Sequence, residues 1–330
     1  MRAIGAGWPA PMPAETIGTA LQWGGLLALI LGLLAVDLGL LQRRERRGRG
    51  AGAGAALAWS GAWTAVALLF NLWVCLRFGR RAGLEFLAAY LVERALSFDN
   101  LFVFLLIFSY FSVPRPEQSR VLHWGILGTV ALRGIFIALG AVLLARFEML
   151  FFVLGAFLVY SGIKLMRRGE MRAAPEGNPV GALFRRLVPL TAGFRGKSFL
   201  VREGGRILAT PLLLVLVMIE ATDLAFAVDS IPAVFGVTRH PYIIFSSNIF
   251  AILGLRSLYG LLAALAHRFG YLVHGIGLVL VFIGAKMLAA RWIDIPIELS
   301  LAIVAAVLVL AIVASWLYPR NPRNDDVARR

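Results

Sequence analysis

LATPLLLVLVMIEATDLAFAVDSIPAV, residues 208–234, is an apolar block interrupted by three carboxylates. A helix needs about 20 mainly apolar residues to cross the hydrocarbon core of a bilayer, and this block is long enough. The whole chain has the same character, since 60% of its 330 residues are hydrophobic and 15% are charged, against about half and a quarter in soluble domains. The sequence therefore predicts an all-α polytopic membrane helical bundle.

About nine blocks of the chain are long and apolar enough to be transmembrane helices. The chain is then one transmembrane domain, residues 1–330. The third block is the least regular, because it contains Glu93, Arg94 and Asp99. The predicted spans are residues 19–41, 57–78, 86–111, 121–144, 149–166, 208–234, 242–266, 269–289 and 295–317.

Lysine and arginine residues gather in segments that one orientation places on the same side of the membrane. With the N-terminus outside and the C-terminus in the cytoplasm, the basic run 43–49 and the basic loop 167–207 are both cytoplasmic, as the positive-inside rule requires. We therefore attribute the net charge of +15 to orientation and to anionic lipids of the cytoplasmic leaflet, not to nucleic acid. Within the loop, residues 199–208 have the turn chemistry of a β-hairpin, and residues 180–187 are compatible with an amphipathic helix on the leaflet. We favour a solvated basic loop over a specific lipid or partner site.

Two parts of the chain repeat each other at matching intervals. Residues 97–102 (SFDNLF) align with residues 221–226 (ATDLAF). An aspartate, an arginine and a lysine then follow in the same order, namely Asp99, Arg133 and Lys164 against Asp223, Arg256 and Lys286. Each unit (residues 86–166 and 208–289) holds three spans, so the second must cross in the opposite sense. Such inverted repeats are typical of secondary transporters, whose binding site lies where the repeats meet.

Acidic side chains inside the predicted spans are the strongest functional signal. A charge at the centre of a bilayer costs about 3 kcal/mol on insertion scales, and such residues usually face a cavity or a partner. The acidic residues are Asp37, Glu93, Asp99, Glu220, Asp223 and Asp229. One alternative is that they form ion pairs that join helices. The basic residues available for such pairs are Arg94, Arg133, Lys164, Arg256 and Lys286.

The spacing of the carboxylates limits which of them can act together. Glu220 and Asp223 are three residues apart and share a helix face. Asp223 and Asp229 are six apart, about 240° around a regular helix, so they serve one ion only if the helix is broken. Pro232 removes a backbone donor and offers such a break.

These residues supply oxygen ligands, which suit Mg²⁺, Ca²⁺ or Mn²⁺ better than Zn²⁺ or copper. We expect Asp99 and Asp223 to be the repeat-related core ligands of a metal site near the membrane midplane. Glu220, Asp229 and Asn100 would complete the shell, while Glu93 and Asp37 would act as relay or second-site acids. Ser97 is a further oxygen donor in the same stretch.

Two longer stretches resemble signatures of a known family. Residues 97–111 (SFDNLFVFLLIFSYF) and 220–235 (EATDLAFAVDSIPAVF) are similar to the two signatures of the TerC (tellurium-resistance C) family. The resemblance implies an inner-membrane protein of the LysE-type transporter superfamily, associated with Mn²⁺ export, metal loading of exported proteins and tellurite resistance. The family's functional acidic positions carry over to Glu93, Asp99, Glu220, Asp223 and Asp229.

The leading hypothesis is an exporter of divalent cations, most of all Mn²⁺, that works by alternating access. We expect no enzymatic activity and no tightly bound cofactor, with protons as the candidate coupling ion. Two alternatives stay open. One is a membrane factor that assists stress complexes or membrane-protein assembly without transport. The other is transport of a tellurite oxyanion, for which Arg133 and Arg256 would face a cavity.

Overall fold

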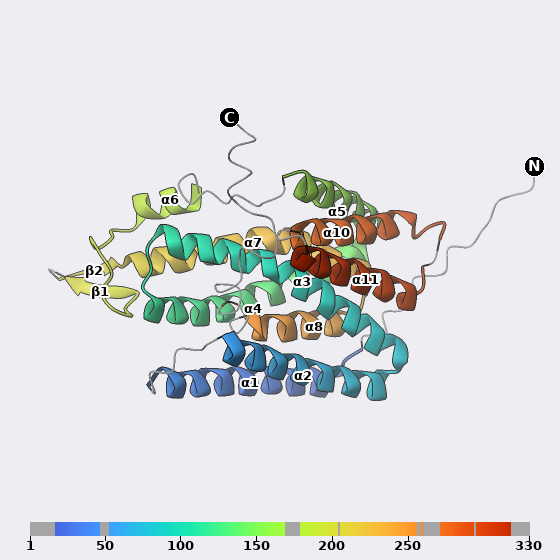
Figure 1. The fold of residues 1–330 in the computed structure, drawn as a ribbon, viewed down its shortest axis with the longest axis horizontal. Coiled ribbons are helices and arrows are strands. Elements are labelled where there is room, and N and C mark those ends of the chain that lie inside the picture. The colour runs from blue at the N-terminus through green and yellow to red at the C-terminus, as the bar shows by residue number, and fades with distance from the viewer. Residues whose placement is uncertain are drawn as a thin grey trace, which may run out of the picture.

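The computed structural model is an all-α bundle whose long helices run roughly along the long axis of the molecule (Figure 1). This confirms the predicted fold class. The structure describes residues 17–46, 53–168, 179–203, 205–255, 259, 271–293 and 295–317. Its elements are α1 (Ala20–Arg46), α2 (Ala53–Phe78), α3 (Arg80–Tyr110), α4 (Arg115–Arg146), α5 (Glu148–Arg168), α6 (Pro179–Leu187), β1 (Leu200–Glu203), β2 (Arg206–Ala209), α7 (Pro211–Val237), α8 (Pro241–Leu253), α10 (Leu272–Ala289) and α11 (Ile297–Leu317).

Seven helices of the described chain are long and apolar enough to cross a membrane: α1, α2, α4, α5, α7, α10 and α11. Two predicted spans correspond to elements outside that set, namely α3, which carries charged residues, and α8, which is short. The protein is therefore an integral multi-pass membrane protein, and the count of nine spans stays a prediction.

Helix α3 lies among other helices rather than at the edge of the bundle, packing against α2, α7, α8 and α11. One of its faces is buried over four turns, through Phe86, Ala89, Glu93, Ser97 and Leu101. These residues recur every three or four positions, which places them on one side of the helix. Because that side meets protein and not lipid, polar groups can lie on it with partners from neighbouring helices.

Helix α8 ends at Leu253, before the predicted limit of its span at residue 266. Its 13 residues extend about 20 Å, less than the roughly 30 Å of the hydrocarbon core. Arg94 of α3 donates a hydrogen bond to the carbonyl oxygen of Ala251 in the last turn, at 2.9 Å. Gly254 forms the C-cap, and a Cβ there would lie 2.8 Å from Nη2 of Arg94. Residues 256–258 and 260–270 lie outside the described part.

Helices α5 and α10 approach each other along a glycine seam formed by Gly155, Gly162, Gly277 and Gly284. A Cβ at Gly162 would lie 2.5 Å from the carbonyl oxygen of Gly277, and a Cβ at Gly284 would lie 2.5 Å from the carbonyl oxygen of Gly155. Small residues permit such backbone approach between membrane helices. The contacts run in opposite order along the two helices, so the helices are antiparallel.

The glycine contacts of the seam match each other under the alignment of the two predicted units. Aligning the two units places Gly155 on Gly277 and Gly162 on Gly284, so each glycine contact is the counterpart of the other. Helix pairs match too, since α3 packs against α8 as α4 packs against α7. A two-fold relation between the units requires such reciprocal contacts. They support the inverted repeat, which stays a prediction.

A hairpin and a short helix occupy one end of the bundle (Figure 1). Strands β1 and β2 pair antiparallel, with Leu200 opposite Ala209 and Glu203 opposite Arg206. Gly205 in the turn has φ of 79°, a left-handed conformation that glycine adopts without a steric cost. Both elements appear where the sequence predicts them. The contact of α6 with lipid stays a prediction.

Helix α7 runs without interruption through Pro232, so the break that this residue offered is not present. Residues 230–236 around the proline are all buried. Prolines are tolerated in membrane helices when neighbouring groups satisfy the freed carbonyl and packing holds the axis. Asp223 and Asp229 therefore point in different directions from a continuous helix.

Candidate functional site

An arginine with no exposed surface is the centre of a polar network inside the bundle. Arg133 of α4 is 0% exposed. Its Nη1 contacts the Glu93 carboxylate of α3 and donates to Oδ1 of Asn248 of α8 at 2.9 Å. Its Nη2 lies 3.3 Å from Oδ1 of Asp223 of α7. One guanidinium therefore joins four helices.

Two asparagine amides complete this polar network, which consists of Arg133, Glu93, Asp223, Asn100 and Asn248. Asn248 donates to Oε2 of Glu93 at 2.9 Å, and Asn100 donates to Oδ1 of Asp223 at 3.1 Å. All five side chains are buried. Burying charges costs several kcal/mol for each ion, and only close pairing with further hydrogen bonds offsets that cost. The network therefore specifies how the four helices meet.

Glu220 lies one turn before Asp223 on α7 and has a different environment. Both of its carboxylate oxygens are buried and have no hydrogen-bond partner among the described residues. The carboxylate lies against α4, where a Cβ at Gly128 would be 2.5 Å from its carboxyl carbon and a Cβ at Gly125 would be 3.7 Å from Oε1. Two glycines thus make a notch that the acid fills.

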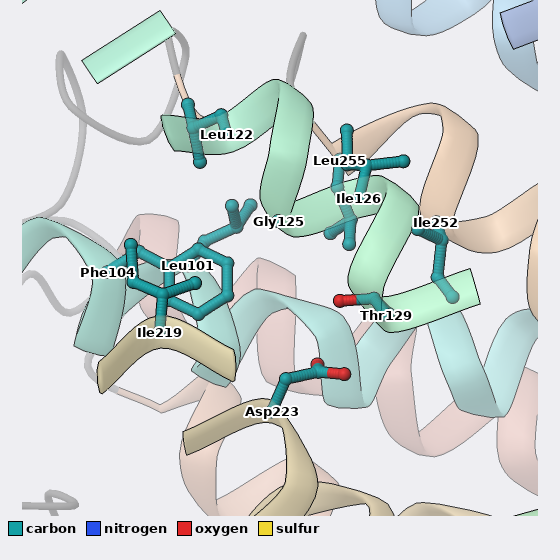
Figure 2. Close-up of a pocket in the computed structure, with 10 residues that line it drawn as sticks. All are labelled: Leu101, Phe104, Leu122, Gly125, Ile126, Thr129, Ile219, Asp223, Ile252 and Leu255. Atoms are coloured by element: carbon teal, nitrogen blue, oxygen red, sulfur yellow. The ribbon is translucent and has the colours of Figure 1, made fainter. Parts of the chain in front are cut away.

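A small pocket adjoins the network between α3, α4, α7 and α8. Figure 2 shows Asp223 directed towards the segment of α4 that carries Thr129. Asp223 is the charged residue of a lining that is otherwise mostly apolar: Leu101, Phe104, Leu122, Gly125, Ile126, Thr129, Ile219, Ile252 and Leu255. The cavity measures about 20 Å³, enough for one water molecule or one small ion.

The structure gathers some of the predicted site residues and separates others. Glu93, Asn100 and Asp223 meet in the polar network, with Glu220 one turn away. Asp229 accepts a hydrogen bond from Ser161 of α5 at 2.9 Å, and Asp37 of α1 accepts one from Trp59 of α2 at 3.3 Å. Neither belongs to the network.

Asp99 lies on α3 next to Asn100, but its side chain is outside what the structure describes. Among the described residues, no three acidic, histidine or cysteine side chains are arranged to hold a metal ion by themselves. Amide and hydroxyl oxygens such as those of Asn100 and Ser97 would therefore have to contribute.

Sequence reasoning missed Asn248 and did not resolve the partners of Arg133. Ion pairing was one stated alternative for the carboxylates, and Glu93 and Asp223 do pair with Arg133. The signal for Asn248 was available, since residues 246–248 (SSN) are a polar run inside an apolar block. Such a run indicates a helix face that meets other polar groups.

Comparison with known proteins gives the family. The model of the integral membrane protein TerC family matches residues 78–323. An uncharacterized membrane protein of Myxococcus xanthus is 44% identical over 311 residues, covering 94% of this chain and 97% of the relative. A protein of Escherichia coli K12 named "Putative membrane-bound redox modulator Alx" is 43% identical over 320 residues, covering 94% and 98%. No solved structure matches. The chain belongs to the TerC family of integral membrane proteins.

Proposed function

We propose that this protein exports a hard divalent cation, Mn²⁺ most of all, across the bacterial inner membrane by alternating access. The observation that supports the proposal is the burial of Glu93 and Asp223 with two amides at a junction of four helices, two from each predicted unit. Carboxylate and amide oxygens are ligands that Mn²⁺ accepts. Binding sites of secondary transporters are found at such junctions.

The surroundings of Arg133 favour a cation over the tellurite oxyanion. An anion site would need a guanidinium free to face a cavity, whereas Arg133 is engaged by Glu93 and Asp223. The charged group that faces the adjoining pocket is the carboxylate of Asp223. An anion there would meet like charge, which is unfavourable in a medium of low dielectric constant. Arg256 lies outside the described residues.

The proposal has three further features. The protein acts as a carrier and not as an enzyme, it needs no resident cofactor, and its N-terminus lies outside with its C-terminus in the cytoplasm. The name of the E. coli relative refers to redox modulation. The present chain has one cysteine, Cys75, so it cannot form a disulfide within itself, and we assign it no thiol–disulfide chemistry.

Transport of radioactive Mn²⁺ into vesicles containing the purified full chain tests the proposal. Asp223→Asn and Asp99→Asn should each lower the initial flux by at least about tenfold, the scale of effects at metal sites. Glu85→Gln is the matched control, because Glu85 is a buried acid that instead binds Thr238 at 2.5 Å and Arg81 at 3.3 Å. Equal flux in all four proteins would contradict the ligand assignment, and no flux in the parent would favour the non-transporting factor.

A further inference from the structure

Arg133 occupies the place where a bound cation would lie. Its guanidinium contacts both Glu93 and Asp223, and all three side chains are 3% exposed or less. Without the guanidinium two buried carboxylates would face each other unpaired, and breaking a buried ion pair in this way is strongly destabilising. Arg133 therefore supplies the positive charge between the two carboxylates.

The guanidinium is incompletely bound, unlike that of a permanent structural ion pair. Its Nε is buried and lacks a hydrogen-bond partner within the described chain. The hydroxyl of Ser97, which is 0% exposed, also lacks a described partner. Ser97 lies on the same face of α3 as Glu93 and Asn100, four residues after one and three before the other. An unpaired buried polar group costs about 1–3 kcal/mol, so the site contains polar groups that another occupant would satisfy.

A second carboxylate lies close to the network, against the helix that carries Arg133. Glu220 is one turn from Asp223 on α7, and both of its oxygens lack described partners. It lies against Gly125 and Gly128 of α4, the helix that carries Arg133 a little more than one turn later. Side chains on a helix lean towards its N-terminus, so the arginine leans towards the turn that Glu220 faces.

We propose that Arg133 is a tethered counter-ion that the transported cation displaces. Its guanidinium binds Glu93 and Asp223 while the site is empty, and it moves to Glu220 when the cation takes the carboxylate pair. The inference rests on the proposed function and deepens it. It makes Glu220 a positioning residue for Arg133 in place of the ligand role predicted from the sequence. It also lets the carrier return without cargo while its buried carboxylates stay neutralised.

Removal of a tethered competitor should tighten cation binding, which general damage to the fold would not do. We expect Arg133→Gln to lower the dissociation constant for Mn²⁺ by about tenfold, measured from the electron paramagnetic resonance of free Mn²⁺ with the purified full chain. Arg94→Gln is the matched control, since Arg94 is a half-buried arginine inside the bundle that binds a carbonyl oxygen and Ser60. Unchanged or weaker binding by Arg133→Gln would overturn the inference.

Should Arg133→Gln fail to fold, Arg133→Lys answers the same question. One ammonium on a flexible stem replaces the planar fork that reaches two carboxylates, so Mn²⁺ binding should still tighten a few-fold. Binding no tighter than the parent's would overturn the inference. No Mn²⁺ binding by the parent or by any variant would instead contradict the proposed function.

A double-mutant cycle separates the two roles of Glu220. If Glu220 acts only through Arg133, Glu220→Gln should weaken Mn²⁺ binding in the parent and have no effect in the Arg133→Gln background. An equal loss in both backgrounds would identify Glu220 as a ligand and would overturn the movement of the guanidinium.

Discussion

The polar network and the glycine seam both join the two predicted units. They differ in how far the aligned residues of the two units match. At the seam the contacts come in counterpart pairs, with Cβ positions at Gly162 and Gly284 each 2.5 Å from an opposing carbonyl oxygen. In the network three of the five counterparts differ, since alignment places Glu93 on Val217, Asn100 on Leu224 and Asn248 on Gly125. The other two, Asp223 and Arg133, align with Asp99 and Arg256.

For the predicted repeat, the difference separates positions that close packing holds alike from positions that need not match. A close backbone contact between two related helices requires small residues on both, so both copies keep glycine. A single asymmetric site needs one arginine, two carboxylates and two amides in one place, and a second set would bury more charge at several kcal/mol for each ion. Three of the five network positions accordingly have an apolar or small counterpart, whereas Asp223 and Arg133 have an acid and an arginine as theirs.

The largest expected effect on stability comes from replacing Glu93 of the network by valine, the residue at the aligned position of the second unit. Glu93→Val should lower the free energy of unfolding by about 3–5 kcal/mol, because it leaves Arg133 with one carboxylate inside the bundle. Thermal or denaturant unfolding in detergent measures the change. Val217→Ala, at the counterpart position and half-buried, should cost about 1 kcal/mol. Equal losses in the two variants would show that the network does not hold the helices together.

An intermediate effect is expected at the seam, where the repeat predicts equality. Gly162→Ala and Gly284→Ala should each destabilise by about 1–3 kcal/mol, the range for inserted methyl groups in packed interiors. Their losses should agree within about 0.5 kcal/mol if the two contacts are counterparts. The same unfolding assay applies, and a clear inequality would argue against the two-fold relation.

The smallest effect on stability is expected at Gly128, the glycine of α4 that lies against the Glu220 carboxylate. There an added methyl group meets the flexible end of Glu220 instead of a backbone. Gly128→Ala should change unfolding by less than about 1 kcal/mol, since the better helix propensity of alanine offsets the displaced carboxylate. Mn²⁺ binding should nevertheless weaken, as in Glu220→Gln, because the added methyl group displaces the Glu220 carboxylate. Unfolding losses as large as those at Gly162 would show that the notch is packed as rigidly as the seam.

The sequence predicted the features that depend on local patterns. Apolar length located the membrane helices, and the turn glycines located the hairpin. The spacing of Asp223 and Asp229 indicated that they could serve one ion only if the helix were broken, although both were placed in one metal shell. In the structure Asp223 contacts Arg133 and Asp229 contacts Ser161. The helix positions, the hairpin and the different directions of the two aspartates are consequences of helix and turn geometry within a few residues.

Features that depend on distant neighbours were beyond sequence reasoning. Five basic residues were available to the carboxylates, and only the packing of α4 against α7 selects Arg133. Pro232 offered a possible break in α7, but the helix is continuous through this residue. Near the end of α8, the Ala251 carbonyl accepts a hydrogen bond from Arg94, which is 157 residues away along the chain.

Consecutive residues of α3 bind α8 at two levels, since Glu93 accepts from Asn248 and Arg94 donates to the Ala251 carbonyl. Two hydrogen bonds at different levels oppose rotation of one helix against the other. We therefore expect α3 and α8 to move as one body, although they come from different predicted units. The corresponding pair, α4 and α7, is linked through Arg133 and Asp223 at 3.3 Å. In the proposed transport cycle, we therefore expect opening and closing to involve sliding or rotation at the α4–α7 contact, with release of the Asn100–Asp223 hydrogen bond.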